Sequence, residues 1–223
     1  MKITDALLQL LFPPKCLLCR KLLTAEELDL CHSCRTDGSD CISSQKKLPF
    51  IDSWTAVWYY ESSARASLLR YKFRGARGYA SGYGRLLAMK LLETHPEGFD
   101  LLTWIPVSRL RRMRRGYDQV ELLAAAVGQE LGLTPTRLLR KTRHNPPQSG
   151  IVGQAQRRAN VLGAYCIESG RDLTNQRILM LDDIITTGAT AGECARVLLT
   201  AGAKEVHCGV VAIARHQANN KVR

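Results

Sequence analysis

Two adjacent carboxylates at the end of an apolar run are the strongest chemical signal in the sequence. The run Ile178-Leu179-Met180-Leu181 has the character of a buried strand and leads directly into Asp182 and Asp183. Because ionised carboxylates are very costly to bury without partners, we expect both acids at the carboxyl end of that strand. This is the edge at which open α/β sheets bind ligands.

A hydroxyl-rich loop follows the two acids and meets a predicted helix. Its residues are Thr186, Thr187, Gly188, Ala189 and Thr190. Backbone N–H groups and hydroxyls at a helix start form a cradle for an anion. Acids that accept from sugar hydroxyls, beside a cradle for phosphate, predict a ribose 5-phosphate ligand. A magnesium-holding ATPase strand is the competing interpretation, but the chain lacks the Gly-Lys dipeptide of the P-loop. A capped turn with exposed acids is the purely structural alternative.

Four cysteines form two Cys-x-x-Cys pairs near the amino terminus. Cys16 and Cys19 make the first pair, and Cys31 and Cys34 make the second after eleven intervening residues. Two such pairs can surround one zinc ion with four thiolates, which leaves no open coordination position, so we predict a structural zinc site. Disulfides or a redox pair are the alternative, which a reducing compartment disfavours. Cys41 lacks a Cys-x-x-Cys partner and is left out of the site.

Positive charge is concentrated in two windows. The 223-residue chain has a formal charge of +12. Residues 65–115 hold twelve basic and three acidic residues, and residues 137–158 hold six basic residues and no acid. A local excess of this kind is typical of a surface that binds phosphate-bearing partners, and arginine suits bidentate phosphate contact. A solvated face that only keeps the protein soluble is the alternative.

The order of expected elements favours an α/β fold with a parallel sheet. Strands are predicted at 54–60, 101–106, 161–167, 177–181 and 205–213. Helices are predicted at 63–73, 85–93, 117–131 and 189–200, with a glycine-rich stretch at 75–84 and a mobile loop at 140–160. A short helix at 3–12, the cysteines and a polar linker suggest a separate unit. We therefore divide the chain into a zinc-binding domain, 1–50, and a larger domain, 51–223.

Export and membrane insertion find no support in the sequence. The apolar start is interrupted by Asp5 and Gln9 and ends at Pro13-Pro14, and no small-residue cleavage site follows. No uncharged apolar stretch is long enough to span a bilayer. We expect a cytoplasmic protein without a membrane span.

The segment 178–190 resembles the signature with which type I phosphoribosyltransferases bind phosphoribosyl pyrophosphate (PRPP). Further motifs narrow the resemblance to the ComF family, which joins a zinc finger to a phosphoribosyltransferase-like domain and includes competence proteins of transformable bacteria. These motifs are Leu-Phe-Pro-Pro-Lys-Cys-Leu-Leu-Cys (11–19), the second cysteine pair, Tyr-Lys-Phe-Arg-Gly (71–75), Ile-Pro-Val-Ser (105–108), Arg-Arg-Gly-Tyr-Asp-Gln (114–119), Arg-Arg-Ala-Asn (157–160) and Gly-Ala-Tyr (163–165). Tyr117-Asp118 stands where Phe-Asn is more usual.

The resemblance implies roles for individual residues. Asp182 and Asp183 would contact the ribose 2′- and 3′-hydroxyls as the catalytic acids, and loop 186–190 would hold the 5-phosphate. Ser108 and Arg109 would belong to a pyrophosphate loop that acts with Mg²⁺. Additional arginines that could neutralise the developing pyrophosphate charge are Arg115 and Arg143.

Three functions remain open at this point. The protein could be an active phosphoribosyltransferase on an unidentified acceptor without direct DNA binding. It could instead act in DNA uptake and natural transformation, as the resemblance implies, handling single-stranded DNA beside a helicase-like uptake motor. The sugar-phosphate pocket could also survive as a sensor. Candidate backbone-binding residues are Arg111, Arg112, Arg114 and Arg143, and candidate stacking residues are Tyr71, Phe73, Tyr79, Tyr83 and Tyr117. The alternative for these aromatics, and the commoner one, is a place in the hydrophobic core.

Overall fold

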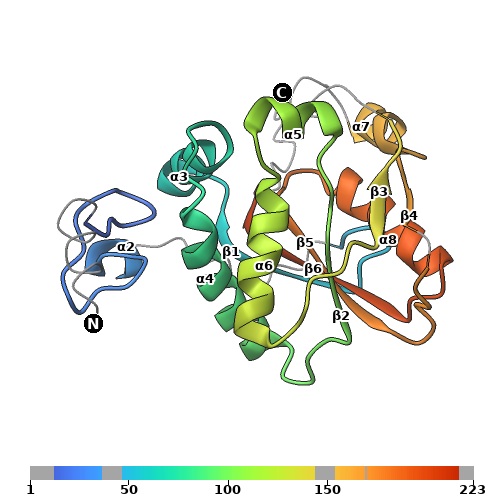
Figure 1. Cartoon of the computed structure of the whole chain (residues 1–223), viewed down its shortest axis with the longest axis horizontal. Helices are drawn as coiled ribbons and strands as arrows, with labels where there is room; N and C mark the ends of the chain where they lie inside the picture. The colour runs from blue at the N-terminus through green and yellow to red at the C-terminus, as the bar shows by residue number, and fades with distance from the viewer. Residues whose placement is uncertain (1–12, 37–46, 144–153, 169, 216–223) are drawn as a thin grey trace, which may run out of the picture.

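The computed structural model describes residues 13–36, 47–143, 154–168 and 170–215 (Figure 1). The predicted helix at 3–12 and Cys41 lie outside these ranges. The described helices are α2 (His32–Thr36), α3 (Ser62–Phe73), α4 (Tyr79–Thr94), α5 (Arg109–Arg115), α6 (Gln119–Leu131), α7 (Gln154–Val161) and α8 (Ala189–Thr200). The strands are β1 (Ser53–Tyr59), β2 (Leu101–Trp104), β3 (Leu139–Lys141), β4 (Tyr165–Ile167), β5 (Arg177–Ile185) and β6 (Glu205–Ile213).

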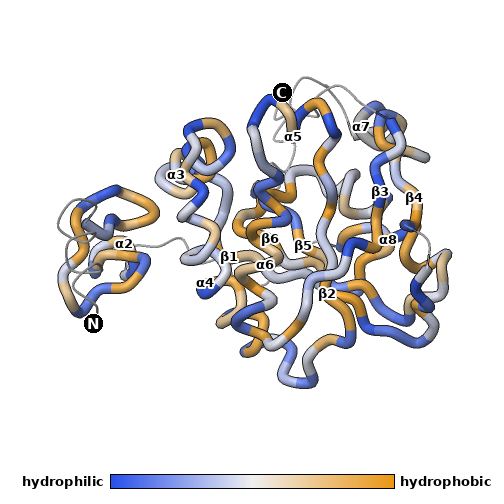
Figure 2. Tube along the Cα trace, viewed as in Figure 1, coloured by the Kyte–Doolittle hydropathy of each residue, from blue (hydrophilic) through white to orange (hydrophobic). Residues whose placement is uncertain are grey.

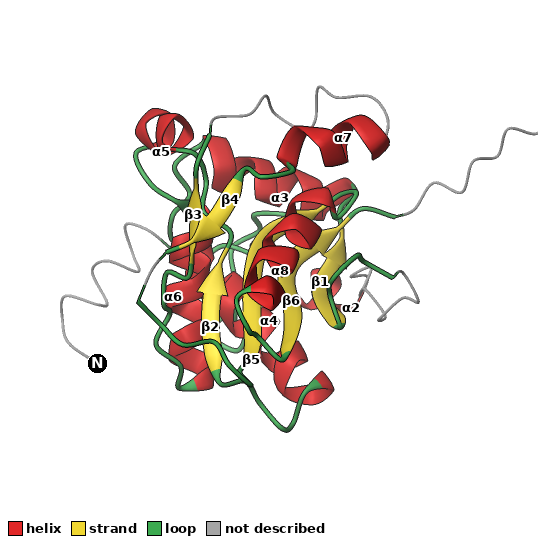
Figure 3. Cartoon of the chain, turned by 90° about the vertical axis from the view of Figure 1, so that its right-hand side faces the viewer, coloured by secondary structure: helices red, strands yellow, loops and turns green. Residues whose placement is uncertain are grey.

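Four strands form one parallel sheet in the order β1-β6-β5-β2. Figures 1 and 3 show α4 and α6 on one face of this sheet and α8 on the other. The strands are apolar along nearly their whole length because both faces are covered, and Figure 2 shows hydrophobic residues gathered along them. The predicted parallel α/β sheet flanked by helices is confirmed.

The order in which the chain adds strands to the sheet reverses between β2 and β5. After α6, Pro135 forms a parallel bridge with Leu102, on the side of β2 away from β5. From β5 the chain instead crosses to β6 through α8, on the opposite face. The carboxyl ends of β2 and β5 therefore flank a topological switch point, where open α/β sheets form ligand crevices.

Several elements differ from the sequence-based expectation. Helix α4 begins at Tyr79, so it includes part of the glycine-rich stretch, in which Gly82 and Gly84 leave room for Asp29 and Ala126. Strand β5 continues past Leu181 to Ile185, so the acid pair lies within its last four residues. The predicted loop at 140–160 includes the end of β3 and most of helix α7. Strand β4 pairs with β3 in a separate two-stranded antiparallel sheet, the β3–β4 sheet, and does not join the main sheet.

No helix within the described ranges combines the length and the apolar character needed to cross a membrane.

Candidate functional site

The two acids at the end of β5 have different surroundings. Asp183 is 4% exposed, and its carboxylate receives Lys72 Nζ at 2.8 Å and Gln119 Nε2 at 2.8 Å. Asp182 is partly buried, and its Oδ1 accepts from the backbone N–H of Asp183 at 2.8 Å. Burial, followed by repulsion from Asp183, raises the pKa of Asp182 to about 8. Helices α3 and α6 thus hold Asp183. Both acids line the smaller of the two cavities described next, and Asp182 also lines the larger.

Two adjoining cavities meet at this strand end. The larger has a volume of about 1000 Å³ and is lined by loop 186–191, by α3 and by α5. The smaller has a volume of about 150 Å³ and is lined by residues 105–107 after β2, by the β3–β4 sheet and by α7. Both cavities therefore open on the switch point of the sheet. The residues that line both are Lys72, Arg111, Arg115, Asp182 and Thr190.

The loop after β5 has the local structure of an anion cradle. Gly188 caps the amino terminus of α8 with φ of +82°, a left-handed conformation that favours glycine. A Cβ at Gly188 would lie 2.5 Å from Leu48 Cδ2, so the loop is also packed from behind. Thr187 Oγ1 accepts from Ala189 N at 3.4 Å. All five predicted loop residues, Thr186, Thr187, Gly188, Ala189 and Thr190, line the larger cavity.

The smaller cavity combines cations with an unpartnered acceptor. Lys141 Nζ donates to the Tyr165 hydroxyl at 3.1 Å, and burial, followed by repulsion from Arg111, lowers the pKa of Lys141 to about 8. Gln119 is 3% exposed, and its Oε1 has no hydrogen-bond partner within the described structure. The cavity can therefore hold an anion against its cations and accept from a donor or a hydrated cation at Gln119. The sequence singled out neither Lys72 nor Lys141, although Lys72 belongs to the motif at 71–75.

The predicted pyrophosphate residues are spread over different positions. Ser108 is buried and caps α5, where its hydroxyl accepts from Arg111 N at 3.4 Å. Arg109 is exposed and lines neither cavity, whereas Arg115 lines both and lies 5.0 Å over the Phe73 ring. Arg143 is exposed and donates to the Leu162 carbonyl at 2.6 Å. Arg115 is therefore the member of this set that lines the cavities together with Asp182.

Some of the residues predicted to bind nucleic acid line the larger cavity, and others lie outside it. Arg111 and Arg114 line the larger cavity, and Arg112 lies outside it, with its Nη2 3.5 Å from Glu121 Oε2. Of the candidate stacking aromatics, Tyr71 and Tyr83 are fully buried in the core, so the expectation that they stack on bases is wrong. Phe73 is 64% exposed and lines the larger cavity, as does Tyr117.

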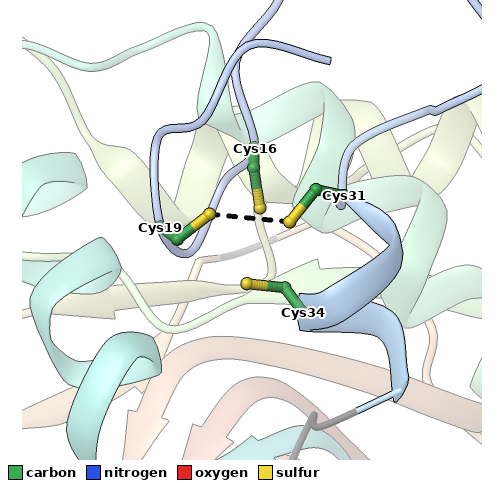
Figure 4. Close-up of side chains that lie close together, drawn as sticks. All are labelled: Cys16, Cys19, Cys31 and Cys34. Carbon is green, nitrogen blue, oxygen red and sulfur yellow. Dashed lines mark hydrogen bonds between the residues drawn. The ribbon is translucent and has the colours of Figure 1, made fainter. Parts of the chain in front are cut away.

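The four cysteines converge on one point in the amino-terminal segment (Figure 4). All four sulfur atoms lie within 4.8 Å of one another, and Cys19 Sγ and Cys31 Sγ are 3.6 Å apart. Tetrahedral zinc–thiolate bonds of about 2.3 Å place sulfurs about 3.8 Å apart, so the cluster fits zinc. The Ser33 hydroxyl lowers the pKa of Cys31 to about 6, whereas burial raises the pKa of Cys19 and of Cys34, so the support for zinc is the geometry of the four sulfurs.

Comparisons with known proteins agree with these features. Residues 120–223 match the phosphoribosyl transferase domain family, and residues 7–45 match the double zinc ribbon domain family. Competence protein F of Haemophilus influenzae is 25% identical over 86% of this chain and 93% of its own. Competence protein ComFC of Streptococcus pneumoniae is 32% identical over 69% of this chain and 65% of its own. The solved glutamine PRPP amidotransferase of B. subtilis is 25% identical, covering 58% of this chain and 26% of that chain, with a TM-score of 0.38.

The sheet topology, the family matches and the cysteine cluster define a phosphoribosyltransferase-like α/β protein with an amino-terminal zinc ribbon. The chain matches the ComF family, which confirms the resemblance seen in the sequence. The zinc ribbon match and the geometry of the four thiols support a structural zinc site.

Proposed function

We propose that this protein binds PRPP with Mg²⁺ where its two cavities meet, and that it acts in DNA uptake by handling single-stranded DNA. The observation that carries the first part is the position of Asp182. This acid lines both cavities, between the anion cradle of the larger and the cations of the smaller. A ligand with an anion at each end and hydroxyls between them matches this arrangement.

In this assignment the 5-phosphate lies on loop 186–190 and the ribose lies at Asp182. The pyrophosphate occupies the smaller cavity, where Lys141, Arg111 and Arg115 carry the opposing charge. When bound with PRPP, Mg²⁺ would neutralise part of the pyrophosphate charge, and the oxygens of Asp182 and Gln119 are suitable outer ligands for it. We also propose that the zinc-binding domain ends at residue 50 and that the protein is cytoplasmic.

The volume of the larger cavity favours a partner beyond the sugar phosphate. Its volume of about 1000 Å³ lies at the upper end of the range for pockets that bind drug-sized ligands. A phosphorylated pentose would therefore leave part of the cavity free. Its walls join Arg65, Arg111 and Arg114 to exposed Phe73, a combination of cations and an aromatic ring that suits single strands. The names of the competence relatives support a role in DNA uptake, in which a helicase-like motor would be the partner.

Calorimetry with PRPP and Mg²⁺ tests the ligand. At pH 9, above the raised pKa of Asp182, we expect Asp182→Asn to weaken PRPP binding by at least about tenfold, since a hydrogen bond to a charged group contributes about 1.5–3 kcal/mol. Asp172→Asn is the matched control, because Asp172 is exposed and accepts from Thr174 N, away from both cavities. Unchanged PRPP affinity in Asp182→Asn would remove the assignment.

Salt dependence of single-strand binding tests the DNA part. We expect affinity for an oligothymidylate to fall steeply with salt, and Arg114→Ala to reduce the logarithmic salt slope by about one. Arg171→Ala, an exposed arginine that lines neither cavity, should leave the slope unchanged. Absent or salt-insensitive DNA binding would favour the alternative, a phosphoribosyltransferase without direct DNA contact. An assay for pyrophosphate released from PRPP would detect that activity.

A further inference from the structure

The loop between the first two cysteines lies directly against helix α3. We call this loop, residues 16–19, the knuckle. The carbonyl oxygens of Leu17 and Leu18, its two central residues, each accept from Arg70 Nη2 at 2.8 Å. The Ser67 hydroxyl also donates to the Leu17 carbonyl. Because these acceptors are main-chain atoms between two thiol ligands, their positions depend on the shape that zinc gives to the knuckle.

A second contact fixes the same face of the amino-terminal segment. Asp29 accepts from Arg85 Nε at 2.9 Å and from Arg85 Nη2 at 2.6 Å, and its own carbonyl accepts from Leu17 N at 2.8 Å. A Cβ at Gly82 would lie 2.5 Å from Asp29 Oδ1, so glycine allows this close approach. Leu17 is 5% exposed and packs in the same hydrophobic cluster as Tyr83. The amino-terminal segment and helix α4 are therefore joined by hydrogen bonds and by buried apolar side chains.

Helix α3 presents its other face to the larger cavity. Arg65, Leu69 and Lys72 recur at the spacing of one helical face and line that cavity. Ser67 and Arg70, three residues apart, form the face that the knuckle contacts. Figure 1 shows α3 between the amino-terminal segment and the rest of the molecule. The helix therefore connects the cysteine cluster to the wall of the ligand cavity.

The link extends to the acid pair. Lys72, two residues after Arg70, brings its Nζ to 2.8 Å from Asp183 Oδ1. The intervening Tyr71 is fully buried and donates its hydroxyl to the Gln119 carbonyl, and Gln119 in turn donates to Asp183. A displacement of the carboxyl-terminal half of α3 would consequently move Lys72 and disturb both partners of Asp183.

We propose that the zinc-shaped knuckle positions the wall of the ligand cavity by holding α3 through Ser67 and Arg70, which keeps Lys72 against Asp183. Arg70 is a positioning residue in this scheme, since it lines neither cavity. The effect on ligand affinity rests on the proposed function, in which that cavity holds PRPP. The effect on α3 itself does not.

Hydrogen exchange on the ligand-free protein tests the positioning directly. We expect amides at 66–73 to exchange at least about tenfold faster in Arg70→Met and after zinc is chelated, while those of α6 and α8 keep their rates. Arg70→Met should retain one equivalent of zinc, and Arg171→Met should behave as wild type. Unchanged exchange at 66–73, or equal acceleration in every element, would overturn the proposal.

Affinity for PRPP with Mg²⁺ gives the second readout. We expect Arg70→Met to bind PRPP about tenfold more weakly, and Arg70→Lys to recover part of the loss because lysine can still donate to one carbonyl. Wild-type affinity in zinc-loaded Arg70→Met would contradict a positioning role. If wild-type protein fails to bind PRPP, the proposed function fails, whereas the exchange experiment still decides the role of the knuckle.

Discussion

Lys72 and Asp183 form an ion pair that joins helix α3 to the carboxyl end of β5, with Nζ 2.8 Å from Oδ1. The lysine side chain is 19% exposed and that of the aspartate 6% exposed, so water screens the pair weakly. The pair connects the helix that contacts the zinc ribbon to the strand that carries the predicted ribose acids. Loss of this ion pair would therefore affect both the packing of α3 and the position of the acids at the end of β5.

Removing the cation should cost more stability than removing the anion. Lys72→Met leaves a carboxylate buried with Gln119 as its remaining side-chain partner, and we expect a loss of about 3 kcal/mol in the free energy of unfolding. Asp183→Asn should cost less, because the amide is neutral and the freed lysine retains access to water. Urea unfolding of both variants measures the difference. Equal losses would show that Asp183 is not held by its charge.

Stability should decline as Asp182 titrates. Burial raises the folded-state pKa of Asp182 to about 8 from 3.8, so its contribution to stability is fully present below about pH 4 and is lost as pH rises through about 8. The side chain of Asp182→Asn cannot titrate. The stability of this variant relative to wild type should therefore increase between pH 5 and pH 8. Urea midpoints at the two pH values measure this gain. A constant difference between the variant and wild type would contradict the elevated pKa.

Glycine at position 188 should be required for two separable reasons. Gly188→Ala would strain a left-handed residue, at about 1–2 kcal/mol, and would also press a methyl group against Leu48. Gly98→Ala is the matched control, because Gly98 has φ of +68° with no atom within 4 Å of its Cβ position. We expect Gly188→Ala to lose more stability than Gly98→Ala in urea unfolding. Equal losses would mean that Leu48 moves aside without cost.

Anion binding in the smaller cavity should take up protons. The pKa of Lys141 is lowered to about 8, chiefly by burial, and an adjacent pyrophosphate would raise it again. At pH 8.5 we expect inorganic pyrophosphate to bind with proton uptake, measured by calorimetry in buffers of different ionisation enthalpy. Asp182 lines the same cavity and also has a pKa of about 8, so the uptake should fall in Lys141→Met and vanish when Asp182→Asn is added. Proton uptake that survives both substitutions would assign the effect to another group.

The sequence predicted what is local. The apolar run before Asp182, the glycine at 188 and the paired Cys-x-x-Cys spacing each lie within a few residues, and each has its structural counterpart here. Helix α8 and strand β6 have the predicted bounds, since glycines at 188 and 202 flank the helix and the strand is a mostly apolar run.

Contacts between distant segments could not be predicted in this way. The partner of Asp183 lies 111 positions earlier in the chain, and only packing of α3 against the body of the domain brings Lys72 to it. The same holds for Arg70 and the knuckle. The burial of Tyr71 and Tyr83 also depends on tertiary packing, so the sequence left both base stacking and a place in the core open for them. A strand was predicted at 161–167 and contains β4, but β3, with three residues, and its pairing with β4 were not predicted.

A crystal structure with PRPP and Mg²⁺ tests the central claim most directly. We predict that the 5-phosphate lies on residues 186–190, that the ribose hydroxyls contact Asp182, and that the pyrophosphate lies near Lys141 and Arg115. A ligand bound away from the end of β5, or cavities without ligand at saturating PRPP, would contradict the account.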